Sequence, residues 1–230
     1  MSDRTQSCLH LRFEYEPWPW PFAKDRRPEI EQYFDLEVKK NPALWNGRLL
    51  LLRKAEVADK AMSGSFFETD YASLLAALDW NAMGDVRAAF PAAAILSLDG
   101  AFIVGEMAEY TRNAGQLVFP SGSVEIADVV GGQVDFSGAM AREILEETGI
   151  APETLDPADE WCAVKVGARL PIIKVMRARE NAADLKKRIS ENLMRQERPE
   201  FREICAVRGP SDLDERIPLW VRAFLEHVWR

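Results

Sequence analysis

The sequence predicts an α/β protein, an α/β/α sandwich around a mixed sheet with a small N-terminal α/β extension. Two observations carry this prediction. Apolar segments of strand length alternate with segments whose apolar residues recur at helical spacing. One long helix, ending in the run REILEETG, has strand-like segments on both sides of it. We place the boundary between an N-terminal part, residues 1–87, and a C-terminal domain, residues 88–230.

The N-terminal part is predicted to hold three strand-like segments and two helices. The strands are expected at Leu9–Tyr15, Arg48–Ala55 and Phe66–Tyr71. The helices are expected at Arg27–Asn41 and Tyr71–Trp80. Before the first helix lies PWPWPF, whose prolines at positions 17, 19 and 21 predict an extended segment without regular structure. We expect this segment to pack over the body of the protein, with binding of a partner as the alternative.

The C-terminal domain is predicted to be richer in strands. The expected strands are Ala92–Leu98, Ala101–Met107, Gly115–Phe119, Trp161–Leu170, Ile172–Arg177 and Phe201–Val207. Two helices are expected besides the central one, at Ala182–Met194 and Ile217–Trp229. Asp99-Gly100 indicates a hairpin turn between the first two strands. Pro171 is expected to break the chain between the fourth and fifth strands.

Composition narrows the class of protein. The 230 residues are 47% hydrophobic and 29% charged, which is typical of a soluble globular protein. The net charge of −8 argues against binding to nucleic acid. No apolar run approaches the roughly 18–20 residues that span a bilayer, and no signal-peptide pattern is present. Three scattered cysteines favour reduced thiols in a cytoplasm. The oligomeric state stays open, a homodimer included.

The segment from Arg142 to Ile150 has the pattern of a helix end with an acidic face. Gly149 stands where a C-cap glycine belongs, because glycine adopts the left-handed conformation without penalty. At about 100° per residue, Glu143, Glu146 and Glu147 fall on one side of the helix. Ile144, Leu145 and other apolar neighbours fall on the opposite side. Three like charges destabilise a helix, whereas Mg²⁺ or Mn²⁺ binds such hard oxygen ligands.

Arg142-Glu143-x-x-Glu146-Glu147-x-Gly149 resembles the second half of a Nudix box. That resemblance implies the Nudix fold over roughly residues 88–230. It also implies hydrolysis of nucleoside diphosphates linked to another moiety, with Mg²⁺ or Mn²⁺ bound on this helix. Glu146 and Glu147 would be metal ligands, Glu143 a further ligand or a base, and Arg142 would orient a glutamate.

The first half of the box departs from the family pattern. The family expects a glycine where this chain has Asp128 and a glutamate where it has Val134. The Pro-Ser-Gly turn ending at Gly122 precedes the box arginine by twenty residues, which indicates a six-residue insertion. Glu125 or Asp135 is expected to replace the glutamate that is missing at Val134. An ordinary amphipathic helix, or a nucleotide-binding sensor with a degenerate box, is the alternative interpretation.

Two subfamily resemblances lead to different substrates. NPALWNGRLLLL and ETDYASLLAALDW are similar to the N-terminal extension of UDP-sugar-hydrolysing Nudix proteins. GQLVFPSG resembles the Gly-Gln-x-x-Phe-Pro-Gly-Gly run of coenzyme A diphosphatases, although Asn113 stands where that family usually has a histidine. We favour a nucleotide sugar such as UDP-glucose. Coenzyme A or ADP-ribose is the alternative substrate.

Further site residues are expected outside the helix. By resemblance, a backbone carbonyl near Gly122 completes the metal shell. A general base on a distant loop is expected among Glu197, Glu200 and Glu203, for which a solvated acidic turn is the alternative interpretation. Arg112 is expected to bind phosphate, with a surface hairpin arginine as its alternative.

Overall fold

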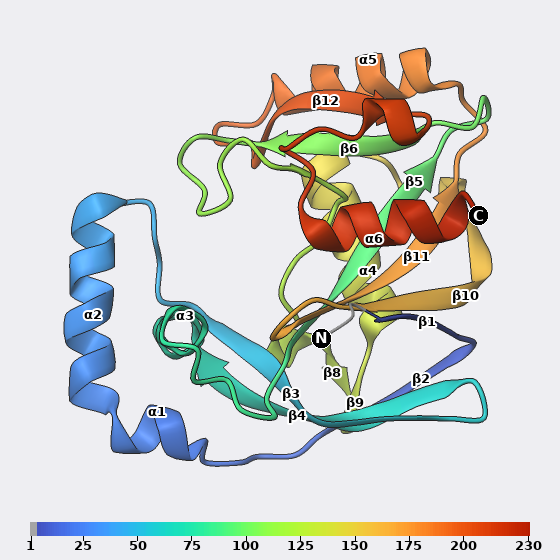
Figure 1. Ribbon diagram of the computed structural model, residues 1–230. Coiled ribbons are helices and arrows are strands. Elements are labelled where there is room, and N and C mark those ends of the chain that lie inside the picture. Colours follow the sequence, from blue (N-terminus) through green and yellow to red (C-terminus); the bar gives the residue numbers. More distant parts are fainter. Residues whose placement is uncertain (1–3) are drawn as a thin grey trace.

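A computed structural model describes residues 4–230 (Figure 1). Its strands are β1 (Arg4–Cys8), β2 (His10–Tyr15), β3 (Arg48–Ala58), β4 (Ala61–Asp70), β5 (Ala88–Leu96), β6 (Phe102–Met107), β7 (Leu117–Val118), β8 (Val129–Val130), β9 (Gln133–Val134), β10 (Asp156–Lys165), β11 (Arg169–Arg177) and β12 (Phe201–Val207). Its α-helices are α1 (Pro21–Asp25), α2 (Arg27–Lys40), α3 (Tyr71–Asp79), α4 (Phe136–Thr148), α5 (Ala182–Leu193) and α6 (Leu219–Val228).

A seven-stranded mixed sheet forms the centre of the protein. Its order is β1-β10-β11-β5-β6-β12, with β7 also paired to β6. The β11–β5 pair is parallel and the other pairs are antiparallel. Figure 1 shows α6 in front of this sheet and α4 behind it. The predicted α/β class, with helices around a mixed sheet, is confirmed.

A second sheet of five strands, in the order β3-β4-β2-β9-β8, lies below the first in Figure 1. The insertion predicted before the box arginine forms its last two strands. Gly131 and Gly132 both have positive φ, 59° and 82°, as the two central residues of a tight hairpin require. β9 then pairs with β2 through Gln133 and Glu14. The insertion therefore extends the second sheet.

Both parts of the predicted division contribute to both sheets. β1, from the N-terminal part, pairs with β10, while β8 and β9, from the C-terminal part, join the second sheet. One hydrophobic core runs between the sheets, where Phe13 and Phe66 pack against Phe136 of α4 with ring centroids 5.0 and 5.6 Å away. The boundary at residues 87 and 88 stays a prediction.

Two predictions about prolines were wrong. Pro21 begins α1, because proline at the first helical position lacks only an N–H that would be unpaired anyway. Pro171 lies inside β11, opposite Phe90 of β5, and the chain turns earlier, at Gly167 with φ of 58°. The packing predicted for the tryptophan-rich segment is confirmed, since Trp20 is buried against Phe67.

No helix within residues 4–230 is both long and apolar enough to cross a membrane.

Candidate functional site

Helix α4 is fixed at both ends by the residues that flank it. Asp135 caps its N-terminus by accepting a hydrogen bond from the Gly138 N–H at 2.9 Å. Gly149 closes its C-terminus with φ of 68°, as the sequence predicts. Met140 and Ile144, one turn apart, are buried in the core. Glu143 between them, and Glu146 and Glu147 in the next turn, are thereby held in a defined orientation.

The acidic face of α4 points into the protein. Glu143 and Glu147 are 8% and 5% exposed, whereas the side chain of Glu146 is 59% exposed. Leu145, predicted on the buried side, is 52% exposed, so that prediction was wrong. The reason is geometric, because Leu145 lies about 200° around the helix from both buried glutamates.

The loop after β7 covers the two buried carboxylates. The Ser121 N–H donates a hydrogen bond to Glu147 Oε2 at 2.9 Å. A Cβ placed on Gly122 would lie 2.2 Å from Glu143 Cδ, so only glycine lets this carboxylate lie against the loop. Glu200, just before β12, lines the same cavity as Glu143 and Glu146, and its charge acts on Glu147. Two buried carboxyl groups of α4 therefore lie behind the Ser121–Gly122 loop, with the exposed Glu200 from a distant segment near them.

Arg142 is the cation closest to this cluster. Its guanidinium contacts the Glu143 carboxylate at 2.5 Å, Asp128 at 3.3 Å and Glu146 at 3.5 Å. Asp128, which the family pattern would replace by glycine, thus serves as a partner of the box arginine. Arg142 therefore contacts one buried carboxylate, Glu143, and two further ones at the edge of the cluster.

The pKa values of the clustered carboxyls are raised. Burial raises the pKa of Glu143 to about 7, with Glu146 adding to the rise and Arg142 opposing it. Burial, then the charges of Glu143 and Glu200, raise the pKa of Glu147 well above its usual range. Partial burial of its carboxyl also raises the pKa of Glu200. Ionising all of these carboxyls together is therefore unfavourable without a cation beside them.

The chemistry of this donor set fits a hard divalent cation. Clustered carboxylate oxygens are the ligands that Mg²⁺ and Mn²⁺ prefer, and a cation would relieve the repulsion among them. Within residues 4–230, no three Asp, Glu, His or Cys side chains already surround a common point as a metal shell would. Glu143 and Glu146 instead contact Arg142. Metal binding would require these two carboxylates to exchange that partner.

The three candidate bases lie in different places. Glu200 contacts the carboxylate cluster. Glu203 lies on β12 and forms an ion pair with Lys186 of α5 at 3.3 Å. Glu197 is exposed between α5 and β12 and lines none of the cavities described here. Of the three, only Glu200 is brought to the carboxylates of α4.

A cavity of 520 Å³ opens over the carboxylates, and we call it the acidic cavity. Its charged lining residues are Glu125, Arg142, Glu143, Glu146, Glu200, Arg48 and Arg112. Glu125, one of the two predicted stand-ins for the missing acid, is thus near the cluster. The other stand-in, Asp135, is engaged in capping α4.

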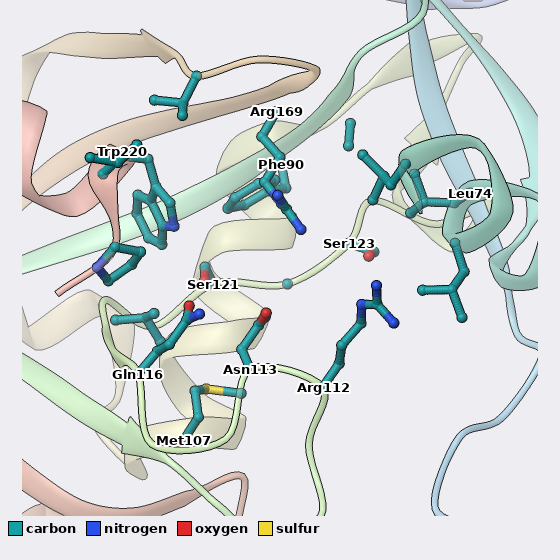
Figure 2. Close-up of a pocket in the computed structure, with 18 of the residues that line it drawn as sticks. Leu74, Phe90, Met107, Arg112, Asn113, Gln116, Ser121, Ser123, Arg169 and Trp220 are labelled. Atoms are coloured by element: carbon teal, nitrogen blue, oxygen red, sulfur yellow. The ribbon is translucent and has the colours of Figure 1, made fainter. Parts of the chain in front are cut away.

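A second cavity, of 380 Å³, adjoins the first, and we call it the arginine cavity (Figure 2). Phe90 of β5 and Trp220 of α6 form one wall, with rings edge to face at 5.7 Å. Leu74 and other apolar residues of α3 form the opposite wall. Arg112 and Arg169 project into it. The two cavities share the Ser121–Ser123 loop.

Arg112, the predicted phosphate-binding residue, lines both cavities. Its guanidinium forms an ion pair with Asp79, at the end of α3, at 2.6 Å. Tyr33 of α2 donates a hydrogen bond to the same carboxylate. Burial alone would raise the pKa of Asp79, but the hydrogen bonds from Tyr33 and Arg112 outweigh it and lower the pKa. The N-terminal helices therefore anchor Arg112.

Sequence reasoning missed several residues that form this cleft. Asp79, Arg169, Phe90 and Trp220 are far apart in the chain, and each alone has the pattern of a surface charge or a core aromatic residue. The one signal was Trp220, two residues after Pro218, in the first turn of the predicted last helix. No spacing rule joins it to the other three.

Comparison with known proteins gives matches among solved structures only. No family model and no curated protein matches the chain. A MutT protein from Methanosarcina mazei Go1 is 23% identical, with a TM-score of 0.40, covering 61% of this chain and 91% of its own. A Nudix hydrolase from M. smegmatis, RenU, is 16% identical, with a TM-score of 0.41, covering 62% and 83%. Likeness at these levels establishes neither activity nor substrate.

Proposed function

We propose that this chain is a Nudix-type pyrophosphohydrolase that depends on Mg²⁺ or Mn²⁺. It would cleave the diphosphate of a nucleoside diphosphate linked to another moiety. A nucleotide sugar such as UDP-glucose is the first candidate substrate, and coenzyme A or ADP-ribose is the second. The acidic cavity is the proposed site of cleavage.

One observation carries this proposal, the burial of Glu143 and Glu147 together behind the Ser121–Gly122 loop, with Glu200 lining the same cavity as Glu143. Burying like-charged carboxyls together is costly unless they are paired or bind a cation. A protein that only binds nucleotides has no need of such a cluster, because cations rather than carboxylates attract phosphate. The arrangement therefore favours a hydrolase over a nucleotide sensor.

The roles follow from position. Glu143, Glu146 and Glu147 would hold the cation, with a backbone carbonyl near Gly122 as a further ligand. When bound, the cation neutralises diphosphate charge and lowers the pKa of a water molecule. Glu200 takes a proton from water as it attacks one phosphorus in line, and the bond to the leaving phosphate breaks.

The positions of Arg142 and Arg112 suggest supporting roles. Arg142 keeps the Glu143 carboxylate oriented through their contact at 2.5 Å. Arg112, which lines both cavities, would hold the diphosphate where they meet. Its fixed partner, Asp79, limits the freedom that this side chain loses on binding.

The experiment measures product release from UDP-sugars, ADP-ribose, NADH, coenzyme A and dinucleoside polyphosphates, with Mg²⁺ and with Mn²⁺. The wild type is compared with a Glu146→Gln/Glu147→Gln double variant, and Glu200→Gln is compared with Glu203→Gln. We expect turnover of one substrate class by the wild type and none by the double variant. Loss of a general base should lower kcat of Glu200→Gln by about 10²- to 10⁴-fold.

Glu203→Gln is the matched control for Glu200→Gln. It makes the same charge change three residues away, at a side chain that pairs with Lys186 on α5. Its kcat should remain near that of the wild type. If no substrate is turned over while a nucleotide still raises the melting temperature, the hydrolase proposal is wrong and the sensor takes its place.

A further inference from the structure

The arginine cavity has a charge opposite to that of the whole protein. The chain carries a net charge of −8, and the neighbouring acidic cavity is lined by four glutamates. The residues lining the arginine cavity include Arg112 and Arg169 but no aspartate or glutamate. A concave surface lined by one sign of charge attracts ligands of the opposite sign. This cavity therefore favours an anionic group.

The two arginines differ in how their charge is compensated. Arg112 is paired with Asp79 at 2.6 Å. Within residues 4–230, no carboxylate lies within 4.0 Å of the Arg169 guanidinium, and its N–H groups donate no hydrogen bond to another side chain or to a carbonyl. Figure 2 shows Arg169 reaching past Phe90 toward the Ser121–Ser123 loop. Asp79, which is paired with Arg112, acts on Arg169 only from beyond 4.0 Å, so the guanidinium donors of Arg169 are left for a ligand.

The backbone explains why Arg169 points into the cavity. Gly167, with φ of 58°, turns the chain between β10 and β11, and Arg169 is the first residue of β11. There it lies opposite Ala88 of β5, whose small side chain leaves room beside Phe90. The orientation of Arg169 is thus set by strand pairing at the cavity wall.

Arg169 is exposed, with apolar side chains beside it. A ligand seated against Phe90, Trp220 and the leucines of α3 would displace water from beside Arg169, and electrostatic attraction grows as the local dielectric constant falls. The same walls accept a flat organic group, since the rings of Phe90 and Trp220 offer apolar surface. A volume of 380 Å³ is within the range of small-molecule sites.

Arg169 does not line the acidic cavity, whereas Arg112 lines both cavities. A diphosphate held over Glu143 and Glu146 would therefore meet Arg112. Arg169 remains for a group farther along the substrate. The geometry separates the two guanidinium groups into two binding roles.

We propose that the substrate carries a second anionic group, in addition to its diphosphate, and that Arg169 binds it. This group is a carboxylate or a phosphate monoester on the organic half that occupies the arginine cavity. The proposal rests on the proposed hydrolase function. It makes Arg169 a specificity-determining residue, because a guanidinium pairs with either group through two parallel hydrogen bonds.

The test uses pairs of substrates that differ by one anionic group. UDP-glucuronate against UDP-glucose tests a carboxylate, and coenzyme A against dephospho-coenzyme A, or NADPH against NADH, tests a phosphate monoester. The enzymes are wild type, Arg169→Gln and Arg169→Lys. Arg177→Gln, at the exposed far end of the same strand, is the matched control.

We expect the wild type to prefer the anionic member of one pair in kcat/KM. Arg169→Gln should lower kcat/KM for that member by roughly 10- to 100-fold, the effect of losing a charge-assisted hydrogen bond, and leave the other member unchanged. Arg169→Lys should lower kcat/KM less than Arg169→Gln does, since lysine keeps the positive charge but lacks the two parallel N–H donors of the guanidinium. Arg177→Gln should behave as the wild type.

Two results would overturn the proposal. If the wild type does not discriminate within any pair, no second anion is recognised. If Arg169→Gln slows both members of a pair equally, Arg169 binds the diphosphate that they share. Calorimetric titration of the same pairs on metal-free protein measures the preference without turnover. Absence of turnover would thus count against the hydrolase alone, while the binding preference still decides the role of Arg169.

Discussion

The two cavities of the cleft are built in different ways. The acidic cavity takes its main residues from a single turn of α4, with Glu200 added from the segment before β12. The arginine cavity combines α3, β5, the segments around Arg112 and Arg169, and the start of α6. Residues that come from one helix, as in the acidic cavity, leave a local pattern in the sequence. Residues that come from five separate segments, as in the arginine cavity, leave no such pattern, because the whole fold brings them together.

Gly122 lines both cavities. A side chain at this position should impair catalysis in the acidic cavity far more than ligand binding in the arginine cavity. Gly122→Ala would place a Cβ 2.2 Å from Glu143 Cδ and displace that carboxylate. A shift of about 1 Å at reacting groups can cost about 10²-fold, so we expect kcat to fall by about that factor. The dissociation constant for a ligand in the arginine cavity should change little, as calorimetry would show.

Gly209→Ala is the control for this change. Gly209 has extended backbone and open surroundings, so a methyl group there meets no atom within 4 Å. Its kcat should equal that of the wild type. Unchanged kcat in Gly122→Ala would mean that Glu143 is not needed in its present position, which would contradict its role as a ligand.

Much of the acidic cavity was predictable because its signals are local. Helical periodicity and Gly149 predict α4 and its end, and the spacing of the glutamates predicts their clustering. Which of them is buried was not predictable from the helix alone. Burial depends on the loop that carries Ser121 and Gly122, and the position of that loop depends on β6 and β7.

The arginine cavity could not be predicted, for a physical reason. Its ion pair joins Arg112 to Asp79 across 33 positions, and its aromatic wall joins Phe90 to Trp220 across a still longer stretch. The hairpin that carries Arg169 was also misplaced, because Pro171 is a stronger local signal than Gly167. Contacts of this kind follow from sheet order, which local propensity does not determine.

The ion pair between Arg112 and Asp79 gives a second test of the two cavities, with a smaller expected effect. Asp79→Asn removes its ion pair, so the arginine must lose more rotamer freedom when it binds a ligand. We expect KM to rise about 10-fold, in line with up to about 1.5–2 kcal/mol of side-chain entropy, and kcat to change less. Steady-state kinetics with saturating Mg²⁺ measures both parameters.

A double-mutant cycle provides the control for this interpretation. If Asp79 acts only through Arg112, the Asp79→Asn/Arg112→Gln variant should be no worse than Arg112→Gln alone. Additive losses would show that Asp79 affects the site by another route. The exposed Asp35→Asn, on the neighbouring helix α2, should leave both kinetic parameters unchanged.

The smallest effect concerns the stability of α3, whose leucines line the arginine cavity and not the acidic cavity. Asp70 caps α3 by accepting hydrogen bonds from the Ser73 N–H and hydroxyl, both at 2.8 Å, and it pairs with Arg27 at 2.9 Å. Asp70→Ala should lower the free energy of unfolding by about 1–2 kcal/mol, as loss of an N-cap does. Urea unfolding at pH 7 measures this difference. Asp35→Ala is the control, because Asp35 is exposed within α2 and caps no helix.

The same residue predicts how the difference depends on pH. Burial would raise the pKa of Asp70, but the hydrogen bonds from Arg27 and Ser73 prevail and hold it below its ordinary value of 3.8. A carboxyl whose pKa is lower in the folded state stabilises the fold above its unfolded pKa, and that stability is lost as the pH falls through the folded pKa. The gap between wild type and Asp70→Ala should therefore be constant from pH 7 to about pH 5 and narrow below about pH 4. A gap that stays the same at pH 3 would show that Asp70 stabilises α3 by packing and not by its charge.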